Sequence, residues 1–446
     1  MAVELENEEI PRYLRVYNYY KDLILSGTMA AGTKLPSIRK GSAQLQMSRT
    51  TMETAYMLLA AEGYIASRPQ SGYYVTDIAQ RQSGRTGALG AQKKREETRI
   101  EYDFVTQGVD RESFRFELWR RYMKSALRQD ERLLSYGEPQ GEQEFREVLG
   151  GYLQEMRSVI CTPDQIVIGA GVQTLLQILC PLLKERGKIA FHNPEFLQGR
   201  AVFEDYGFEM ADNYREEGTG MYYISPSQMA KWEGVMPIAD RLNLVGEASE
   251  RKLLLIEDDY NSEFRYFQRP TPSLQGLAGG RGVVYLGTFS KMLLPSIRMS
   301  FMVLPPELLG EYEKRKNNYN QTASKAEQIA ITQFIRDGHL AGQIRKSRKI
   351  HLAKAAELAR AARNVFGERV QTRIEEAGFH VMLSFQTEKS SREIAGKARS
   401  AGVAVIPVPE AAPGVQETGE ATVMLVCANV ASQDYEAAME QLRRCI

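Results

Sequence analysis

GTFSKMLLPSIR, at residues 287–298, is the most informative stretch of this 446-residue chain. It places Lys291 among small hydroxyl residues and ahead of Arg298, at the end of the apolar run 282–287. Similar apolar, β-branched runs occupy residues 165–169, 252–257 and 299–304, and helix-like stretches alternate with these runs. This alternation is typical of a mainly parallel sheet with flanking helices. The sequence therefore predicts an α/β fold for the large part of the chain.

The run LLLIEDDYNSEFRY, at residues 253–266, supplies partners for Lys291 in one particular chemistry. A lysine amine can condense with pyridoxal 5′-phosphate (PLP) as a Schiff base, an aspartate can pair with the pyridine nitrogen, and a tyrosine can bond the phenolic oxygen. Lys291, Asp258 and Tyr260 fit these three roles. None of them is informative alone, but the set with this spacing indicates a PLP site.

The phosphate group of such a cofactor needs fixed donors, and two segments offer them. Arg298 can supply a bidentate guanidinium, with a hydroxyl from Ser290 or Thr288 beside the lysine. The sequence GAGVQ, at residues 169–173, lies between a predicted strand and a predicted helix, where backbone N–H groups bind anions. The predicted cradle consists of Gly171, Val172 and Gln173.

Length and composition bound the remaining possibilities. A chain of 446 residues exceeds what one hydrophobic core usually organises, so two or more domains are expected. Its 43% hydrophobic content is that of globular proteins, and its net charge of +1 neither favours nor excludes nucleic-acid binding. The N-terminus is acidic, no apolar stretch is long enough to span a membrane, and the four cysteines are scattered. We therefore expect a cytoplasmic protein without a metal site.

A change of composition divides the chain. Residues 77–101 are rich in Gly, Ser, Gln and charge and nearly free of large apolar residues, which is typical of a flexible linker. Residues 1–76 form a part of the size of a small DNA-binding module. Residues 102–446 form the α/β part, in which a long helix at 338–363 leads into a small α+β C-terminal part.

The N-terminal part has the pattern of a helix-turn-helix followed by a β-hairpin. Apolar residues at helical spacing predict a first helix that Gly27 ends. Pro36 suits the start of a second helix that runs to about Leu45, and Ser48 has the chemistry of an N-cap for a third. EGYIASRPQSGYYV, at residues 62–75, predicts a two-stranded wing.

Such a module reads DNA with the exposed N-terminal turn of its third helix, and its wing reaches the backbone or the minor groove. The predicted DNA contacts are Pro36, Ser37, Arg39, Ser48, Arg49, Thr50, Thr51, Arg68 and, at the tip of the wing, Gln70, Ser71 and Gly72. The alternative for the same pattern is a generic three-helix interaction domain.

These motifs resemble the winged helix of GntR-type bacterial repressors. G-x4-G-x2-LPS-x-R, SR-T-T, Y-x2-L-x2-EGY and SG-YYV occur in this order across the whole module. The resemblance implies sequence-specific binding to an operator. Gly41 and Ser42 depart from it, since the family usually has Leu-Ala there, and Gln46 occupies a turn position that favours glycine.

The region from Phe104 to the end resembles fold-type I aminotransferases, and its pairing with the winged helix resembles the MocR subfamily of GntR regulators. The resemblance rests on residues 104–108, Trp119, YGEPQG at 136–141, NPEF at 193–196, EDDYNSEFRY at 257–266 and GTFSKMLLPSIRMSFMVLPP at 287–306. It implies that Phe196 stacks on the cofactor ring and that Tyr136 reaches the phosphate in the partner subunit. It also implies a homodimer, and leaves open whether the winged helices are exchanged between subunits.

Two departures bear on whether this part is an enzyme. The family's run P-S-H-Q-F-P-T-G appears as PSQMAKWEG at residues 226–234, which weakens the expectation of a polar contact near the cofactor. Aminotransferases usually also present a C-terminal arginine that clamps the substrate carboxylate, but no arginine occurs between Arg399 and Arg443. The clamp for a standard α-amino acid is therefore not found.

The favoured interpretation is a DNA-binding transcription regulator, without a catalytic residue, whose large domain senses a small molecule. PLP, alone or joined to an amino compound, would shift the dimer between arrangements that hold the winged helices differently on DNA. The sequence does not decide between these two effectors. One alternative is a true PLP-dependent aminotransferase with an appended helical domain. The other is a regulator that has lost the cofactor, against which the joint presence of Asp258, Tyr260, Lys291 and Arg298 argues.

Overall fold

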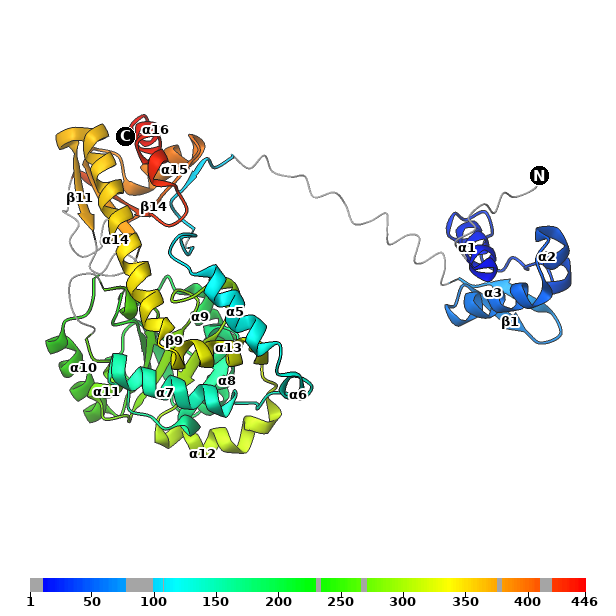
Figure 1. Ribbon diagram of the computed structural model, residues 1–446, viewed down its shortest axis with the longest axis horizontal. Helices are drawn as coiled ribbons and strands as arrows, with labels where there is room; N and C mark the ends of the chain where they lie inside the picture. Colours follow the sequence, from blue (N-terminus) through cyan, green and yellow to red (C-terminus); the bar gives the residue numbers. More distant parts are fainter. Residues whose placement is uncertain are drawn as a thin grey trace. The chain divides into compact units, whose positions relative to one another are not determined.

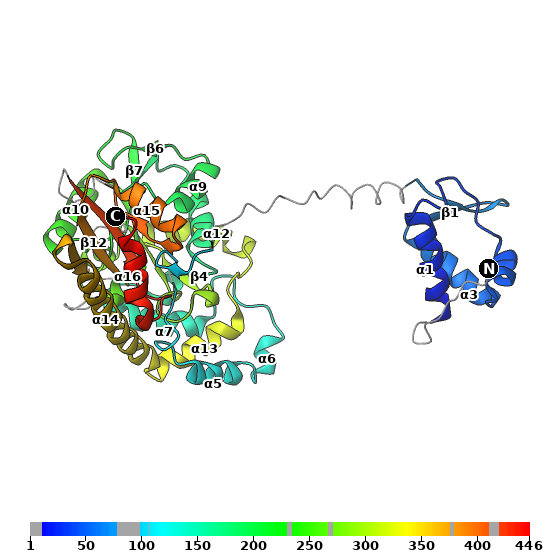
Figure 2. The same ribbon diagram turned by 90° about the horizontal axis from the view of Figure 1, so that it is seen from above.

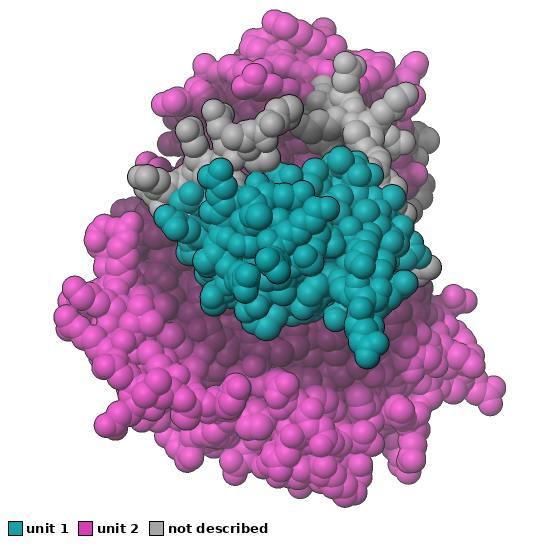
Figure 3. Space-filling model, turned by 90° about the vertical axis from the view of Figure 1, so that its right-hand side faces the viewer, with its two compact units in different colours: residues 1–97 teal, residues 98–446 magenta. Residues whose placement is uncertain are grey.

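The computed structural model describes residues 11–77, 99–106, 108–229, 234–265, 271–374, 379–409 and 419–446. The chain divides into two compact units, residues 1–97 and 98–446 (Figure 3). The linker predicted at residues 77–101 lies largely outside the described residues.

The described residues of the first unit form three helices followed by a hairpin (Figures 1 and 2). Its elements are α1 (Arg12–Leu25), α2 (Ile38–Leu45), α3 (Arg49–Ala61), β1 (Ile65–Arg68) and β2 (Gly72–Val75). As predicted, α1 ends just before Gly27, which has a positive φ of 77°, and the side chain of Ser48 caps α3 by accepting a hydrogen bond from the backbone N–H of Thr51 at 3.1 Å. Gln46 ends α2 with a φ of 53°, the backbone conformation that glycine adopts more easily.

Two predictions for this unit are wrong by one or two residues. Pro36 is not the first residue of the second helix, because Ser37 is the N-cap and accepts from the N–H of Lys40 at 3.3 Å. The carbonyl of Pro36 instead accepts from the hydroxyl of Tyr56 at 3.0 Å. Gly72 is not at the tip of the wing, because it is the first residue of β2 and pairs with Arg68.

The packing of the first unit explains why residue 41 is a glycine. A Cβ at this position would lie 2.5 Å from the Cε of Met52, which is fully buried between α2 and α3. The missing side chain at Gly41 therefore makes room for Met52 in the core, which also contains Tyr20 and Tyr56 with ring centroids 5.4 Å apart.

The second unit is built on a seven-stranded sheet with the order β4-β10-β9-β8-β7-β5-β6. The strands are β4 (Ile166–Gly169), β5 (Lys188–Phe191), β6 (Met210–Ala211), β7 (Thr219–Ile224), β8 (Leu254–Asp259), β9 (Val283–Thr288) and β10 (Ser300–Val303). The pairs among β5, β6, β7, β8 and β9 are parallel, and β10 is antiparallel to both of its neighbours. The mainly parallel sheet predicted from the four apolar runs is confirmed.

Both faces of this sheet are buried, because alternate residues of each strand enter different cores. Tyr285 of β9 belongs to the core that contains Phe145 and Phe334, whereas its neighbour Leu286 belongs to the core that contains Leu176. The helices of this layered part are α5 (Phe116–Ala126), α6 (Asp130–Leu133), α7 (Gln143–Arg157), α8 (Val172–Leu179), α9 (Leu197–Asp205), α10 (Ile238–Arg251), α11 (Leu274–Leu277), α12 (Pro306–Arg315) and α13 (Lys325–Arg336).

A long helix, α14 (His339–Phe366), leads from this layered part into a smaller C-terminal part (Figure 1). There, a four-stranded sheet has the order β11-β12-β15-β14 and only antiparallel pairs. Its elements are β11 (Val370–Ile374), β12 (His380–Gln386), α15 (Ser391–Ser400), β13 (Val403–Ala404), β14 (Ile406–Pro407), β15 (Glu420–Val426) and α16 (Tyr435–Arg443). A short strand from the start of the unit, β3 (Tyr102–Asp103), pairs with β13. The predicted α+β part is thus present.

Within the described part of the chain, no helix is long and apolar enough to cross a membrane. The four cysteines are free thiols, and Cys161 alone among them is partly exposed. The described residues contain no group of His, Cys, Asp and Glu side chains that could hold a metal ion.

Candidate functional site

The topology brings the predicted cofactor residues to one edge of the large sheet. Asp258 lies near the carboxyl end of β8, Lys291 follows the carboxyl end of β9, and Gly171 lies between β4 and α8. These strands run in the same direction, since β10 is antiparallel to β4 and β9 alike. The carboxyl ends of such strands are where α/β sheets bind ligands.

Lys291 points its amine into a polar but enclosed environment. Its Nζ donates a hydrogen bond to Oδ1 of Asn261 at 2.6 Å and lies 4.5 Å from the ring centroid of Tyr260 and 5.9 Å from that of Phe379. Burial lowers the pKa of Lys291 to about 7, although the nearby Asp258 opposes this shift. A large fraction of the amine is therefore unprotonated near neutral pH, which is the state that attacks a carbonyl carbon.

Asp258 presents a carboxylate with one unsatisfied oxygen. Its Oδ2 accepts a hydrogen bond from the hydroxyl of Tyr223 at 2.8 Å, while its Oδ1 is buried and has no partner among the described residues. Burial raises the pKa of Asp258 to about 6. A buried anionic oxygen without a donor is costly, and a protonated ring nitrogen of a ligand would satisfy it.

Asp258 lines a cavity of about 350 Å³, a volume in the range of small-molecule sites. The described residues around it are Val172, Asn193, Glu195, Phe196, Gln198, Tyr223, Ile224, Ser225, Asp258 and Tyr260. The rings of Phe196 and Tyr223 are stacked, with centroids 5.3 Å apart and an angle of 30° between their planes. Of the residues predicted from sequence, Val172, Phe196, Asp258 and Tyr260 therefore share this cavity.

In the predicted phosphate cradle, the guanidinium of Arg298 lies close to the backbone of Gly171. A Cβ on Gly171, which has a φ of 98°, would lie 2.7 Å from Nη2 of Arg298. Only glycine lets the guanidinium come this near to the start of α8, where free backbone N–H groups are found. Thr288 accepts from the backbone N–H of Ser290 at 3.2 Å and from the hydroxyl of Ser300 at 3.1 Å, so its side chain is already engaged within the protein. Gln173 follows Val172 in the first turn of α8.

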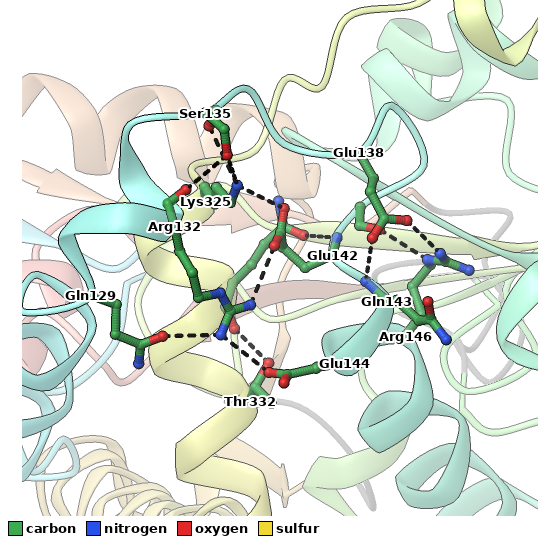
Figure 4. A network of polar contacts seen from close by, with 12 residues as sticks. Gln129, Arg132, Ser135, Glu138, Glu142, Gln143, Glu144, Arg146, Lys325 and Thr332 are labelled. Carbon is green, nitrogen blue, oxygen red and sulfur yellow. Dashed lines mark hydrogen bonds and ion pairs between the residues drawn. The ribbon is translucent and has the colours of Figure 1, made fainter.

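Tyr136 is not at the cavity of its own chain. Its side chain is fully exposed, and that of Leu134 is 89% exposed. The loop that carries them is held by ion pairs (Figure 4), in which Arg132 reaches Glu142 at 3.3 Å and Arg146 reaches Glu138 at 2.9 Å. Lys325 also donates to the hydroxyl of Ser135 at 3.1 Å. The network therefore fixes a loop whose apolar side chains face away from the subunit.

Three residues of the site were not predicted from the sequence. Asn261 accepts from Lys291, and its amide also donates to the side-chain oxygen of Gln228. Gln228 belongs to the run PSQMAKWEG, of which residues 230–233 lie outside the described residues, and its backbone carbonyl accepts from Tyr260 at 3.4 Å. Tyr223 is the donor to Asp258. Asn261 lies in the motif EDDYNSEFRY and Gln228 in PSQMAKWEG, so both could have been found from the sequence. Tyr223, by contrast, looks like an ordinary core residue of a strand.

Neutral and apolar groups lie beyond Lys291 on the side of the C-terminal part. The ring of His351 stacks on Phe379 at 4.0 Å, and both of its nitrogens are buried without a partner among the described residues. Burial lowers the pKa of His351 and of His380 to about 4, with the charge of Lys291 adding to the effect on His380. Both imidazoles are therefore neutral near pH 7.

In the first unit, the predicted DNA-binding residues lie on exposed turns. Arg39, Arg49 and Thr50 are exposed, and Ser48 fixes the first turn of α3 through Thr51. In the wing, the guanidinium of Arg68 lies 4.4 Å from the ring centroid of Tyr74. The ammonium of Lys34, which was not predicted, lies 5.8 Å from the same ring. Exposed cations beside a helix N-terminus and on a wing are what DNA phosphates attract.

The chain is similar to known transcription regulators, both in its first unit and over nearly its whole length. Residues 12–75 match the family described as bacterial regulatory proteins, gntR family. The HTH-type transcriptional regulator YdeL of Bacillus subtilis (strain 168) is 35% identical, and the match covers 98% of this chain and 96% of that protein. The probable rhizopine catabolism regulatory protein MocR of Rhizobium meliloti is 27% identical, over 92% of this chain and 88% of that protein.

Solved structures show the same fold for the second unit. The kynurenine aminotransferase of Pyrococcus horikoshii superposes with a TM-score of 0.65 at 22% identity, and the match covers 83% of this chain and 97% of that chain. The protein thus combines a winged helix-turn-helix with a domain of the fold-type I aminotransferase fold. This combination of domains defines a class of DNA-binding transcription regulators. The chain belongs to the MocR subfamily of the GntR family, as its motifs predicted.

Proposed function

We propose that this regulator binds PLP through Lys291 and that PLP, or an amino compound joined to it, changes how the protein holds its operator. The observation that carries the proposal is the buried Oδ1 of Asp258, which lacks a partner among the described residues and lines the same cavity as Tyr260. Lys291, with a pKa of about 7, lies 4.5 Å from the Tyr260 ring. A nucleophilic amine and an unsatisfied carboxylate beside one cavity suit an aromatic aldehyde with a basic ring nitrogen.

The residues of the chain divide the work of holding this ligand. Lys291 provides the attacking amine, and Asn261 orients it by accepting a hydrogen bond from it. Asp258 holds a proton on the ring nitrogen, and Tyr223 keeps the carboxylate in place. Phe196 covers the ring, while Arg298 and the backbone at Gly171 bind the phosphate. When bound, PLP supplies an aldehyde that combines reversibly with primary amines.

A sensor accounts for the chain better than an enzyme does. Its relatives are named as transcriptional regulators, and it joins this fold to a winged helix. No arginine occurs between Arg399 and Arg443 to clamp a substrate carboxylate. The pKa of His380 is lowered by burial and by the charge of Lys291, so its imidazole is neutral near pH 7 and binds a carboxylate poorly. PLP itself and an amine without an α-carboxylate are both compatible with these groups.

The proposed active species is a homodimer. Tyr136 and Leu134 project from a loop that ion pairs hold in place, and a second copy of the chain would cover them. In that arrangement Tyr136 would complete the phosphate site of the partner. Two winged helices per dimer would then read two half-sites, with Arg39, Arg49 and Arg68 as the main contacts.

The test is a titration of the full-length protein with PLP, followed by absorbance. We expect a band at roughly 410–430 nm for the wild type and none for Lys291→Arg, which keeps the charge but not the reactive amine. Amino donors should cause no rapid turnover. Absence of the band in the wild type would refute the cofactor proposal, and fast multiple turnover of an amino acid would favour the aminotransferase alternative.

A further inference from the structure

A second cavity lies in the large domain, at the opposite end of β8 and β9 from Asp258 and Lys291. Its volume is about 510 Å³, and it opens between α10, α11 and the first residues of both strands. Polar and apolar surfaces contribute about equally to its wall, and the apolar part is continuous with the core beneath α10. The apolar residues that line it are Val245, Ala248, Leu253, Leu255, Leu277, Ala278 and Val283.

The rim of this cavity carries an excess of positive charge. Arg186, Lys252 and Arg281 line it from three separate segments, and no ion pair or side-chain hydrogen bond engages them within the described residues. Glu307 is the one carboxylate among the described lining residues, and its Oε1 already accepts from the backbone N–H of Gly282 at 2.7 Å. Three cations and one carboxylate therefore face the cavity, which leaves a net charge of +2 among its described lining residues.

The backbone fixes the mouth of the cavity. Lys252 ends α10 with a φ of 55°, and this left-handed residue turns the chain directly into β8. Gly282 has a φ of 65° and, through Glu307, ties the start of β9 to α12. Two adjacent strands thus begin at fixed positions, each preceded by a cation. The backbone at the mouth is thus held in place before any ligand binds, which reduces the entropy lost on binding.

We propose that this cavity is a second ligand site, for a small organic anion with an apolar body. The apolar wall would cover an aromatic or branched aliphatic group, and Arg186, Lys252 and Arg281 would bind a carboxylate, sulfonate or phosphate at the rim. A fully apolar ligand would leave the cations without a partner, and an inorganic anion would leave the wall exposed. The proposal does not depend on PLP binding, because the two cavities share no lining residue among those described.

A titration with 8-anilinonaphthalene-1-sulfonate, which has an anionic group on an apolar aromatic body, tests the proposal on the full-length protein. We expect saturable binding that Lys252→Glu/Arg281→Glu weakens at least tenfold, equivalent to about 1.4 kcal/mol. Val245→Trp should weaken it similarly by filling the cavity without changing any charge. Lys184→Glu is the control for a charge reversal outside the cavity, and Arg281→Glu alone is the variant with the same change in net charge, since Lys184 is exposed and does not line the cavity.

Circular dichroism of each variant excludes unfolding as the cause of a loss. Binding that stays within twofold of the wild type in the Lys252→Glu/Arg281→Glu variant would overturn the proposal. A loss of equal size in Lys184→Glu would overturn it as well, because net charge and not this cavity would then govern the probe.

Discussion

Asp258→Asn should have opposite effects on the free protein and on its affinity for PLP. In the structure, burial raises the pKa of Asp258 from 3.8 to about 6. The folded state therefore holds a proton that the unfolded chain has already lost between about pH 4 and pH 6. The free energy of unfolding falls as pH rises through this window, and the full destabilisation by the buried, ionised Asp258 is present above pH 6. The difference corresponds to about 3 kcal/mol, from about 1.36 kcal/mol for each pH unit.

Asparagine removes this cost while it preserves the local geometry. Its carbonyl oxygen can still accept the hydroxyl of Tyr223, which donates to Asp258 at 2.8 Å in the wild type. Without PLP, the free energy of unfolding of Asp258→Asn at pH 7 should exceed that of the wild type by up to about 3 kcal/mol. At pH 3 the difference should have almost disappeared, because the aspartate is then mostly protonated in both states.

The same substitution should weaken PLP binding. The amide places an N–H donor or an uncharged oxygen where the carboxylate would pair with a protonated ring nitrogen, so a charge-assisted hydrogen bond is lost. Such bonds contribute about 1.5–3 kcal/mol, which corresponds to an increase in Kd of roughly 10- to 100-fold. The assays are urea denaturation of the PLP-free protein at both pH values and absorbance titration with PLP. If Asp258→Asn binds PLP as tightly as the wild type, the assigned role of Asp258 is wrong.

Three more substitutions test separate parts of the account. Gly171→Ala should raise the Kd for PLP at least about tenfold, because its Cβ would displace the Arg298 guanidinium and its φ of 98° disfavours alanine; an unchanged titration would remove Gly171 from the phosphate site. Ser48→Ala should speed hydrogen exchange of α3 amides about fivefold, since losing an N-cap costs about 1 kcal/mol. Burial lowers the pKa of His351 to about 4 in the folded protein. As pH falls below 6.5, this histidine is therefore protonated in the unfolded chain before it is protonated in the folded one, and the free energy of unfolding decreases. His351→Phe should make this decrease smaller in urea denaturation between pH 6.5 and 4, and an equally steep decrease would contradict the assignment.

Sequence was sufficient for features that reside in a short continuous motif. The apolar runs predicted β4, β8, β9 and β10, and the spacing of Lys291, Asp258 and Arg298 predicted residues that the structure brings to one edge of the sheet. The direction of β10 was not predictable, because an apolar run has the same composition in parallel and antiparallel pairing. Packing decides that direction.

Partners distant in sequence were missed for a different reason. Tyr223 is an apolar-looking residue in a buried strand, and only the register of β7 with β8 brings its hydroxyl to Asp258. Asn261 pairs with Lys291 although the two carry no opposite charges that would suggest contact. The small errors at Pro36 and Gly72 have local causes, namely the Ser37 cap and the pairing of Gly72 with Arg68.

The most direct test of the central claim is a footprint of the full-length protein on the DNA upstream of its own gene, with and without PLP. We expect sequence-specific protection whose extent or affinity changes with PLP in the wild type and does not change in Lys291→Ala. Arg49→Ala should reduce protection but keep the absorbance of the PLP complex. Protection that is identical with and without PLP in the wild type, or no specific protection under any condition, would contradict the account.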